Sequence, residues 1–214
     1  MFTIVTLASA MTARADPVTF TLTGPDFSGP SQVTGSMTVN IVNITGGVRI
    51  TITNVDLNGF VDELYLNTNV APLAGTSFNC FNCGAIGGVS NLSILFGSNS
   101  FNADGGGNYD IKIELPNAAN DPTRLTAGEA VVFDVFSTTV GFNSDSFLDF
   151  ADPLGGNGPF QIAAHIQGTG PNQLDSDFIT SQPIPEPASL LLLGTGLFGV
   201  AAGLRKRYAG RRKV

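Results

Sequence analysis

The sequence predicts an all-β protein, an antiparallel β-sandwich of jelly-roll type followed by one transmembrane helix near the carboxyl end. Segments in which apolar and polar residues alternate recur through the middle of the chain, and turns rich in Gly and Asn separate them, which is the pattern of an antiparallel sandwich or barrel. No long amphipathic helix competes with this pattern. The length of 214 residues fits one such domain with additional segments at both ends.

The alternation is clearest at residues 48–53 and 110–115, where every second residue is Val, Ile or Leu. Each segment is therefore expected to form a half-buried strand. Further strands are expected at residues 18–23, 32–42, 61–66, 92–96, 130–137 and 160–167. Turns are expected at residues 24–26, 46–47, 104–108 and 155–159, because their Gly and Asn residues tolerate a positive φ. The predicted sandwich covers residues 16–172.

Charge divides the chain into two parts. Residues 16–187 hold three basic residues against all seventeen acids, a net charge of −14. Such a surface repels phosphates, so no nucleic acid partner is expected. Six of the ten Lys and Arg residues lie within the last ten positions, and they are Arg205, Lys206, Arg207, Arg211, Arg212 and Lys213.

The amino-terminal residues 1–15 read as a signal peptide. An apolar run at residues 2–11 precedes Ala13-Arg14-Ala15, which has small residues at the two positions that signal peptidase reads. The expected partners are therefore the secretion machinery and signal peptidase. Signal peptides begin with a positively charged segment, and no Lys or Arg directly follows Met1 to form one. We therefore expect the translation start to lie further upstream. The alternative is a buried first strand.

Residues 188–204 contain no charge and are expected to form the transmembrane helix. Such a helix is about 26 Å long, close to the hydrocarbon thickness of about 30 Å. Arg205, Lys206 and Arg207 are expected to anchor it on the cytoplasmic side, because positive flanks stay in the cytoplasm. Residues 205–214 would then form a cytoplasmic tail, and residues 173–184, which lose the alternation, a stalk outside the membrane. A buried core helix is the alternative for residues 188–204.

A short motif, Pro185-Glu186-Pro187, precedes this apolar segment and the basic tail. This order, over residues 185–207, resembles the PEP-CTERM sorting signal of exported bacterial proteins. Residues 109–166 also resemble a pattern in uncharacterised proteins of that group. The first resemblance implies an exosortase, a membrane-embedded cysteine transpeptidase-like enzyme, as the partner that processes the chain near the motif. The alternative is that the two prolines only end a linker and begin a helix.

The same resemblance implies where the protein goes. During sorting it would lie in the bacterial inner membrane with its middle domain outside the cytoplasm, and finally at the cell surface or outside the cell. The chain would be a substrate of processing and not an enzyme.

Cys80 and Cys83 form a Cys-Phe-Asn-Cys sequence. Outside the cytoplasm we expect this pair to close a small disulfide loop. A thioredoxin-like site would need the first Cys at a helix start, and a zinc site would need two further ligands.

No catalytic motif accompanies the only histidine, His165, so a structural, hydrogen-bonded role is expected for it. No cofactor is expected. The alternative is Ca²⁺ bound by residues 104–110 or by Asp145, Asp149 and Asp152, although Asp and Gly are also ordinary turn residues.

The expected function is that of a surface or matrix component. A module that binds exopolysaccharide or another carbohydrate is the main alternative, since the Thr rows at residues 19–23 and 51–53 could form a polar binding face. Thr is equally the ordinary residue of a solvent-facing strand. A secreted hydrolase is disfavoured because its usual motifs are missing.

Overall fold

A computed structural model describes residues 17–23, 33–70, 76–80, 92–104, 106–118, 121–152 and 160–181. These residues form ten strands and one short 3₁₀ helix, η1 (Ser144–Leu148). The strands are β1 (Val18–Thr23), β2 (Ser36–Ile44), β3 (Gly47–Asn54), β4 (Phe60–Leu66), β5 (Ser77–Cys80), β6 (Ser93–Asn102), β7 (Asn108–Glu114), β8 (Ala130–Phe136), β9 (Ile162–Thr169) and β10 (Asp175–Ser181).

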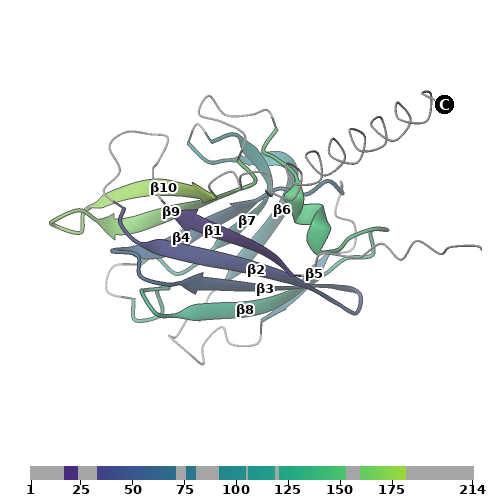
Figure 1. Ribbon diagram of the computed structural model, residues 1–214, viewed down its shortest axis with the longest axis horizontal. Helices are drawn as coiled ribbons and strands as arrows, with labels where there is room; N and C mark the ends of the chain where they lie inside the picture. Colours follow the sequence, from purple (N-terminus) through teal and green to yellow (C-terminus); the bar gives the residue numbers. More distant parts are fainter. Residues whose placement is uncertain are drawn as a thin grey trace, which may run out of the picture. The chain divides into compact units, whose positions relative to one another are not determined.

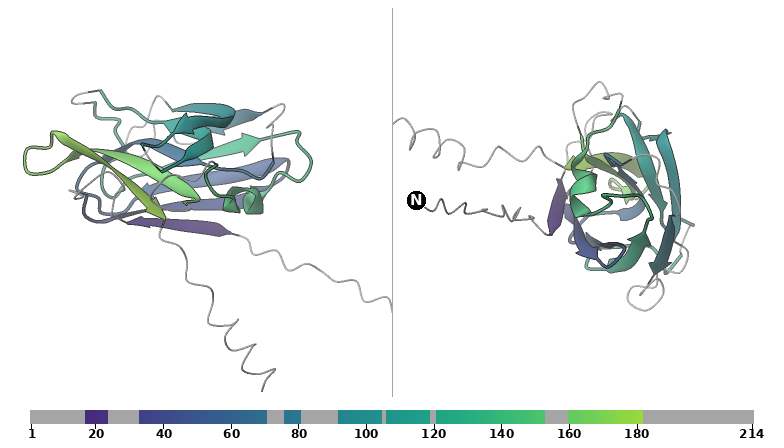
Figure 2. Two further views of the ribbon diagram at one scale, coloured as in Figure 1. Left: turned by 90° about the horizontal axis from the view of Figure 1, so that it is seen from above. Right: turned by 90° about the vertical axis from the view of Figure 1, so that its right-hand side faces the viewer.

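All ten strands belong to one antiparallel sheet, in the order β5-β8-β3-β2-β1-β10-β9-β4-β7-β6. The sheet curls until it is nearly closed as a barrel (Figures 1 and 2). Its two five-stranded halves face each other and join where β1 pairs with β10, over only two residue pairs.

The predicted all-β, antiparallel class is confirmed, whereas the jelly-roll sandwich of two separate sheets is wrong. The reason is β10. Residues 175–181 fall within the predicted stalk, but they pair with β9 along nearly their whole length and with β1 at their end. This strand makes the two halves one sheet. The folded part therefore continues past residue 172, to Ser181.

The predicted terminal segments lie outside the described residues, namely the signal peptide at 1–15, the transmembrane helix at 188–204 and the basic tail at 205–214. Within the part of the chain that the structure describes, no helix has the length and apolar character needed to cross a membrane.

The core lies between the two halves of the sheet. Alternation along most of the strands sends every second side chain inward, and the apolar residues at these positions are almost wholly buried. Both halves contribute to one cluster, for example Ile50 and Phe133 from one half with Leu64 and Ile113 from the other. Each such side chain contributes about 1.5–3 kcal/mol by leaving water, so this cluster is what holds the two halves together.

The hairpin between β2 and β3 depends on its two glycines. Gly46 has a φ of +79°, which favours a residue without Cβ. Gly47 needs the same property for a different reason, because a Cβ there would lie 2.1 Å from the carbonyl oxygen of Val135 on β8. The close approach of β3 and β8 thus requires glycine at residue 47.

Candidate functional site

A β-bulge on β4 places polar side chains on the outer face of the sheet. Val61 pairs with Ile166 and Glu63 pairs with His165, so Asp62 is an extra residue with no partner of its own on β9. Val61 and Leu64 both face the core. The two acidic residues between them therefore point away from it, as expected for a bulge that redirects a side chain.

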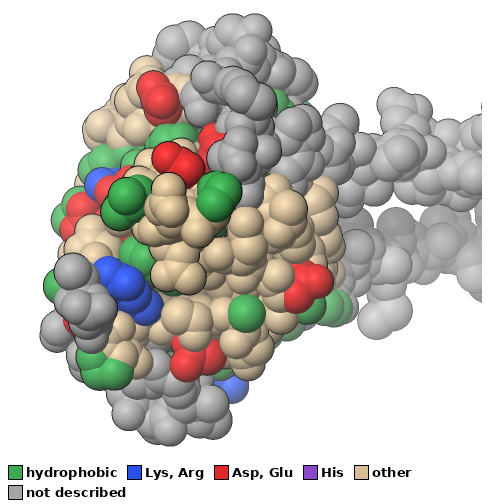
Figure 3. All heavy atoms as spheres, turned by 90° about the vertical axis from the view of Figure 1, so that its left-hand side faces the viewer, with side chains coloured by type: hydrophobic (Ala, Val, Ile, Leu, Met, Phe, Trp, Pro, Cys, Tyr) green, Lys and Arg blue, Asp and Glu red, His purple; other side chains and the backbone are tan. Residues whose placement is uncertain are grey.

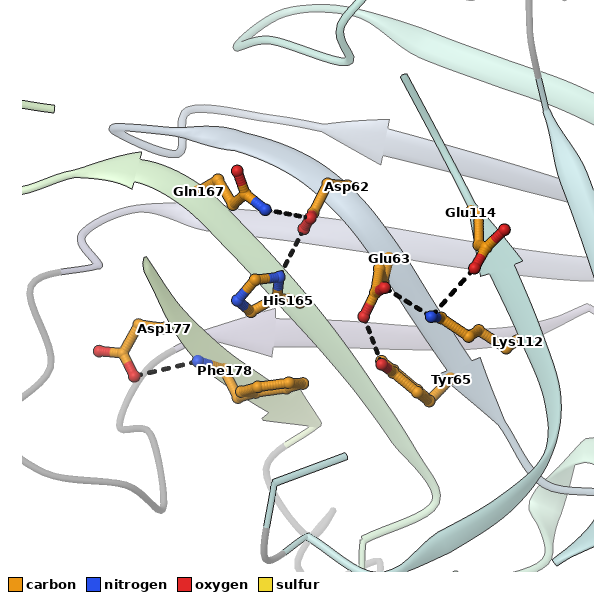
Figure 4. Close-up of polar contacts among 9 residues, drawn as sticks. All are labelled: Asp62, Glu63, Tyr65, Lys112, Glu114, His165, Gln167, Asp177 and Phe178. Atoms are coloured by element: carbon orange, nitrogen blue, oxygen red, sulfur yellow. Dashed lines mark hydrogen bonds and ion pairs between the residues drawn. The ribbon is translucent and has the colours of Figure 1, made fainter. Parts of the chain in front are cut away.

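Asp62 is only 2% exposed and is bound from two sides by β9 (Figure 4). Its Oδ2 accepts a hydrogen bond of 2.6 Å from Nε2 of Gln167. Its Oδ1 lies 2.8 Å from Nδ1 of His165, and this oxygen has no other partner among the described residues. The His165 side chain is 17% exposed. A buried carboxylate is stable only with such partners.

The Asp62 carboxylate sets the protonation of the imidazole. Burial by itself would lower the pKa of His165, but the bond to Asp62 and the negative charges of Asp62, Glu63 and Asp177 outweigh it and raise that pKa. The side chain therefore holds its proton to a higher pH than a free histidine does. The predicted structural role of His165 agrees with this environment, because both its contacts and its charge hold β9 against β4.

Next to this pair, Lys112 of β7 bridges two acids (Figure 4). Its Nζ lies 2.6 Å from Oε1 of Glu63 and 3.0 Å from Oε1 of Glu114, which face each other across β4 and β7. Burial alone would raise the pKa of Glu63, but hydrogen bonds from Lys112 and from the Tyr65 hydroxyl lower it. Burial opposes a charge on Lys112, yet the two acids raise its pKa. Both groups are held in their charged forms.

Aromatic rings cover this polar network. Tyr65 lies 5.8 Å from Tyr109 and 6.0 Å from Phe178, measured between ring centroids. The Phe178 ring also lies 4.7 Å from the His165 ring. These aromatic residues belong to a second buried cluster, separate from the main core. By excluding water they strengthen the ion pairs beneath them.

A pocket of about 650 Å³ lies at one end of the curled sheet. We call it the end pocket. It is lined by the β3–β4 connection, residues 124–127 and the β9–β10 hairpin. That hairpin forms the left-hand end in Figure 1, and Figure 3 views the same end face-on, where the surface is mostly uncharged and polar with separate acidic and basic side chains. Gln167 links the end pocket to the network, since it lines the pocket while holding Asp62.

Arg124 brings a positive charge into the end pocket. Its guanidinium lies over the Phe60 ring, 4.1 Å from the centroid, in a cation–π arrangement. Nη2 donates a hydrogen bond of 3.2 Å to the carbonyl oxygen of Asn117. Nε is buried and has no hydrogen-bond partner among the described residues.

A second, smaller pocket of about 390 Å³ is acidic. Four of its lining residues are Asp62, Glu63, Glu114 and Asp121. Three of these acids already hold His165, Gln167 or Lys112. Within the residues that the structure describes, no group of three or more His, Cys, Asp or Glu side chains is arranged to hold a metal ion.

Two of the residues considered for calcium, Asp110 and Asp145, have local structural roles. Asp110 is buried, and its two carboxylate oxygens accept backbone hydrogen bonds from Asn99 and Thr68. Asp145 lies in the first turn of η1.

Most of the predicted site residues lie outside the described residues. Cys80 ends β5 and Cys83 lies outside the described residues, so their disulfide stays a prediction. Pro185, Glu186 and Pro187, as well as Arg205, Lys206 and Arg207, also lie outside them. Sequence reasoning missed Arg124 and Asp62 altogether. For Asp62 a signal exists, because two acids in a row between Val61 and Leu64 interrupt the alternation.

The comparisons with known proteins concern the carboxyl-terminal part of the chain. No curated protein and no solved structure matches this sequence. Residues 183–207 match the family described as the PEP-CTERM protein-sorting motif. The predicted resemblance of residues 185–207 to the sorting signal is thus confirmed, and the matched segment includes Pro185-Glu186-Pro187 and Arg205 to Arg207. The resemblance predicted for residues 109–166 stays a prediction. The motif implies an exported protein that passes the membrane, with an exosortase as its processing partner. The chain therefore carries a PEP-CTERM sorting signal at residues 183–207.

Proposed function

We propose that the protein is a cell-surface or extracellular-matrix component that an exosortase sorts and processes through residues 183–207. In this proposal residues 188–204 span the inner membrane during sorting, with Arg205, Lys206 and Arg207 on the cytoplasmic side. The observation that carries the proposal is the sorting motif, which follows a self-contained β-sheet that ends at Ser181. The sheet would then be the part delivered outside the cytoplasm.

We further propose that the chain is a substrate and not an enzyme. Three acidic residues that line the smaller pocket support the proposal that the chain is not an enzyme, because other side chains hold them. Glu63 and Glu114 share Lys112, and the lowered pKa of Glu63 makes it a poor proton donor at neutral pH. Asp62 is tied to His165 and Gln167.

The test is the intact mass of the protein recovered from the native envelope. We expect the wild-type chain to lose the residues that follow the Pro-Glu-Pro motif. In the variant Glu186→Gln we expect export to continue while the full-length carboxyl end is retained. The control is Glu129→Gln, which makes the same substitution within the folded part of the chain. This variant should mature normally. Normal maturation of Glu186→Gln would contradict the role given to the motif.

A second candidate function is binding of exopolysaccharide or another carbohydrate, which the end pocket favours. Sugar sites are hollows with a few directed polar groups. The end pocket is a hollow whose lining includes the polar residues Asn58, Gln167 and Gln173 and the exposed Leu174. Calorimetric titration of the full chain with defined oligosaccharides tests it, and absence of heat with every sugar would contradict it.

A further inference from the structure

We propose that the end pocket binds a saccharide that bears a carboxylate group, and that Arg124 recognises this group. The inference rests on the carbohydrate-binding function proposed above and adds the chemical class of the sugar. It is independent of how the sorting motif is processed.

Arg124 differs from the other two Lys and Arg residues of the described part of the chain. Arg49 forms an ion pair with Asp134, with Nε 2.8 Å from Oδ1. Lys112 is shared between Glu63 and Glu114. Among the described residues Arg124 has no carboxylate within ion-pair distance, and its Nη2 donates to a neutral carbonyl. Besides the hydrogen bonds from Thr123, the charge of Arg124 helps to lower the pKa of Asp121, but it forms no ion pair with that residue. Among the described Lys and Arg residues, Arg124 is therefore the one that a ligand carboxylate can still pair with directly.

The guanidinium is held in place before any ligand binds. Phe60 supports its face and the Asn117 carbonyl fixes Nη2. Phe60 in turn fits against Gly168, where a Cβ would lie 3.1 Å from the ring and where φ is +73°. Nε is buried and has no partner among the described residues, so a ligand in the end pocket would reach the guanidinium through its Nη groups. A carboxylate can accept charge-assisted hydrogen bonds from these groups.

Other groups in the end pocket suit the rest of a sugar. The amide side chains of Gln167 and Gln173 can bond hydroxyl groups, and Leu174, 85% exposed, offers an apolar contact for the C–H face of a ring. Asp175 also lines the pocket. Its negative charge disfavours a carboxylate beside it and so directs that group toward Arg124.

The acidic surface determines which ligands can be used as probes. A long polyanion is repelled by the net charge of residues 16–187, which is −14. At physiological ionic strength this repulsion is screened beyond about 8 Å. A short acidic oligosaccharide therefore responds mainly to the local charge of Arg124.

The experiment is calorimetric titration of the full chain, kept in a poly(oxyethylene) ether detergent because that detergent has neither sugar nor carboxylate. Tetragalacturonate is the acidic probe and cellotetraose the neutral one. We expect the wild-type protein to prefer the acidic probe. Arg124→Gln should weaken binding of the acidic probe about ten- to a hundredfold, because a hydrogen bond to a charged group contributes about that much to affinity. Binding of the neutral probe should not change. Arg124→Lys should retain part of the preference.

Arg49→Gln is the matched control, because it makes the same substitution at a 42% exposed side chain that does not line the end pocket. Far-UV circular dichroism of each variant establishes that the sheet is retained. Equal binding of both probes, unchanged by Arg124→Gln, would overturn the role of Arg124 but leave carbohydrate binding in place. No binding of either probe would overturn both. An equal loss in the Arg49 and Arg124 variants would show an effect of net charge and would also overturn the proposed site.

Discussion

Replacing Asp62 by Asn should change how the stability of the sheet depends on pH. The substitution removes the carboxylate charge next to His165 and keeps the size of the side chain and the bulge. Because the folded-state pKa of His165 is raised, the pair stabilises the fold fully below the unfolded pKa of about 6.5. This contribution is lost as the pH rises through the folded pKa. The Asp62→Asn variant should lack it at every pH.

The expected magnitude follows from burial. Removing one partner of a fully buried ion pair costs about 3–5 kcal/mol. Asp62 meets this condition, but the His165 side chain is 17% exposed and water can partly replace its partner. Gln167 can also keep its hydrogen bond by donating to the new amide oxygen. We therefore expect a loss of about 2–3 kcal/mol in the free energy of unfolding near pH 5.5, and a smaller loss above neutral pH.

Urea unfolding followed by circular dichroism between pH 5.5 and 8.5 measures this difference. The imidazole can be titrated directly by NMR, since the chain contains one histidine and its ring resonance needs no assignment, provided that no polyhistidine tag is present. The His165 pKa should fall in the variant. A stability loss that is the same at all pH values, together with an unchanged His165 pKa, would refute the reasoning.

Two further predictions concern the stability of the sheet, one at Gly47 and one at Lys112. Gly47→Ala should lower the free energy of unfolding in urea by about 2–3 kcal/mol, because the new Cβ would meet the Val135 carbonyl oxygen. Gly128→Ala is the control, since its Cβ would enter open space, and its φ of +83° should cost only about 1 kcal/mol. Equal losses in the two variants would contradict the steric argument. Lys112→Met should cost about 1–3 kcal/mol at pH 7, because it leaves Glu63 and Glu114 facing each other unpaired. The lowered folded-state pKa of Glu63 means that this stabilisation is lost as the pH falls through that pKa, so the cost should shrink in acid. The double variant Lys112→Met/Glu114→Gln should recover part of it, and no recovery would argue against charge repulsion.

The strands that alternate regularly could be predicted from sequence. Residues 18–23 form β1 with the expected bounds, and the predicted inward residues of 48–53 are buried. Periodicity works here because one face of each strand meets the core and the other meets water.

The strands that were missed do not meet that condition. β5 has four residues, too few to show a period. β10 begins with two exposed residues, and buried Thr180 and Ser181 follow each other at its end, so its sequence reads as a polar linker. Its place in the sheet comes from pairing with β9 and β1, which no local pattern reveals.

The end pocket could not be predicted for a related reason. Arg124 and Phe60 are far apart in the sequence and meet only because Val61 forms a bridge with Leu125. The sorting motif is the opposite case. Its function depends on the order of a few neighbouring residues, so the sequence is sufficient to find it.

The end of β10 constrains how the sorting motif can be read. Ser181 is its last residue, and residues 182–184 alone separate it from Pro185. Fully extended, the four steps from Ser181 to Pro185 reach at most about 14 Å. β10 has strands on both sides, so releasing more chain would mean breaking the sheet at the junction of its two halves. An enzyme that acts at Pro185-Glu186-Pro187 must therefore either accept a folded sheet close to its active site or act before β10 has joined the sheet.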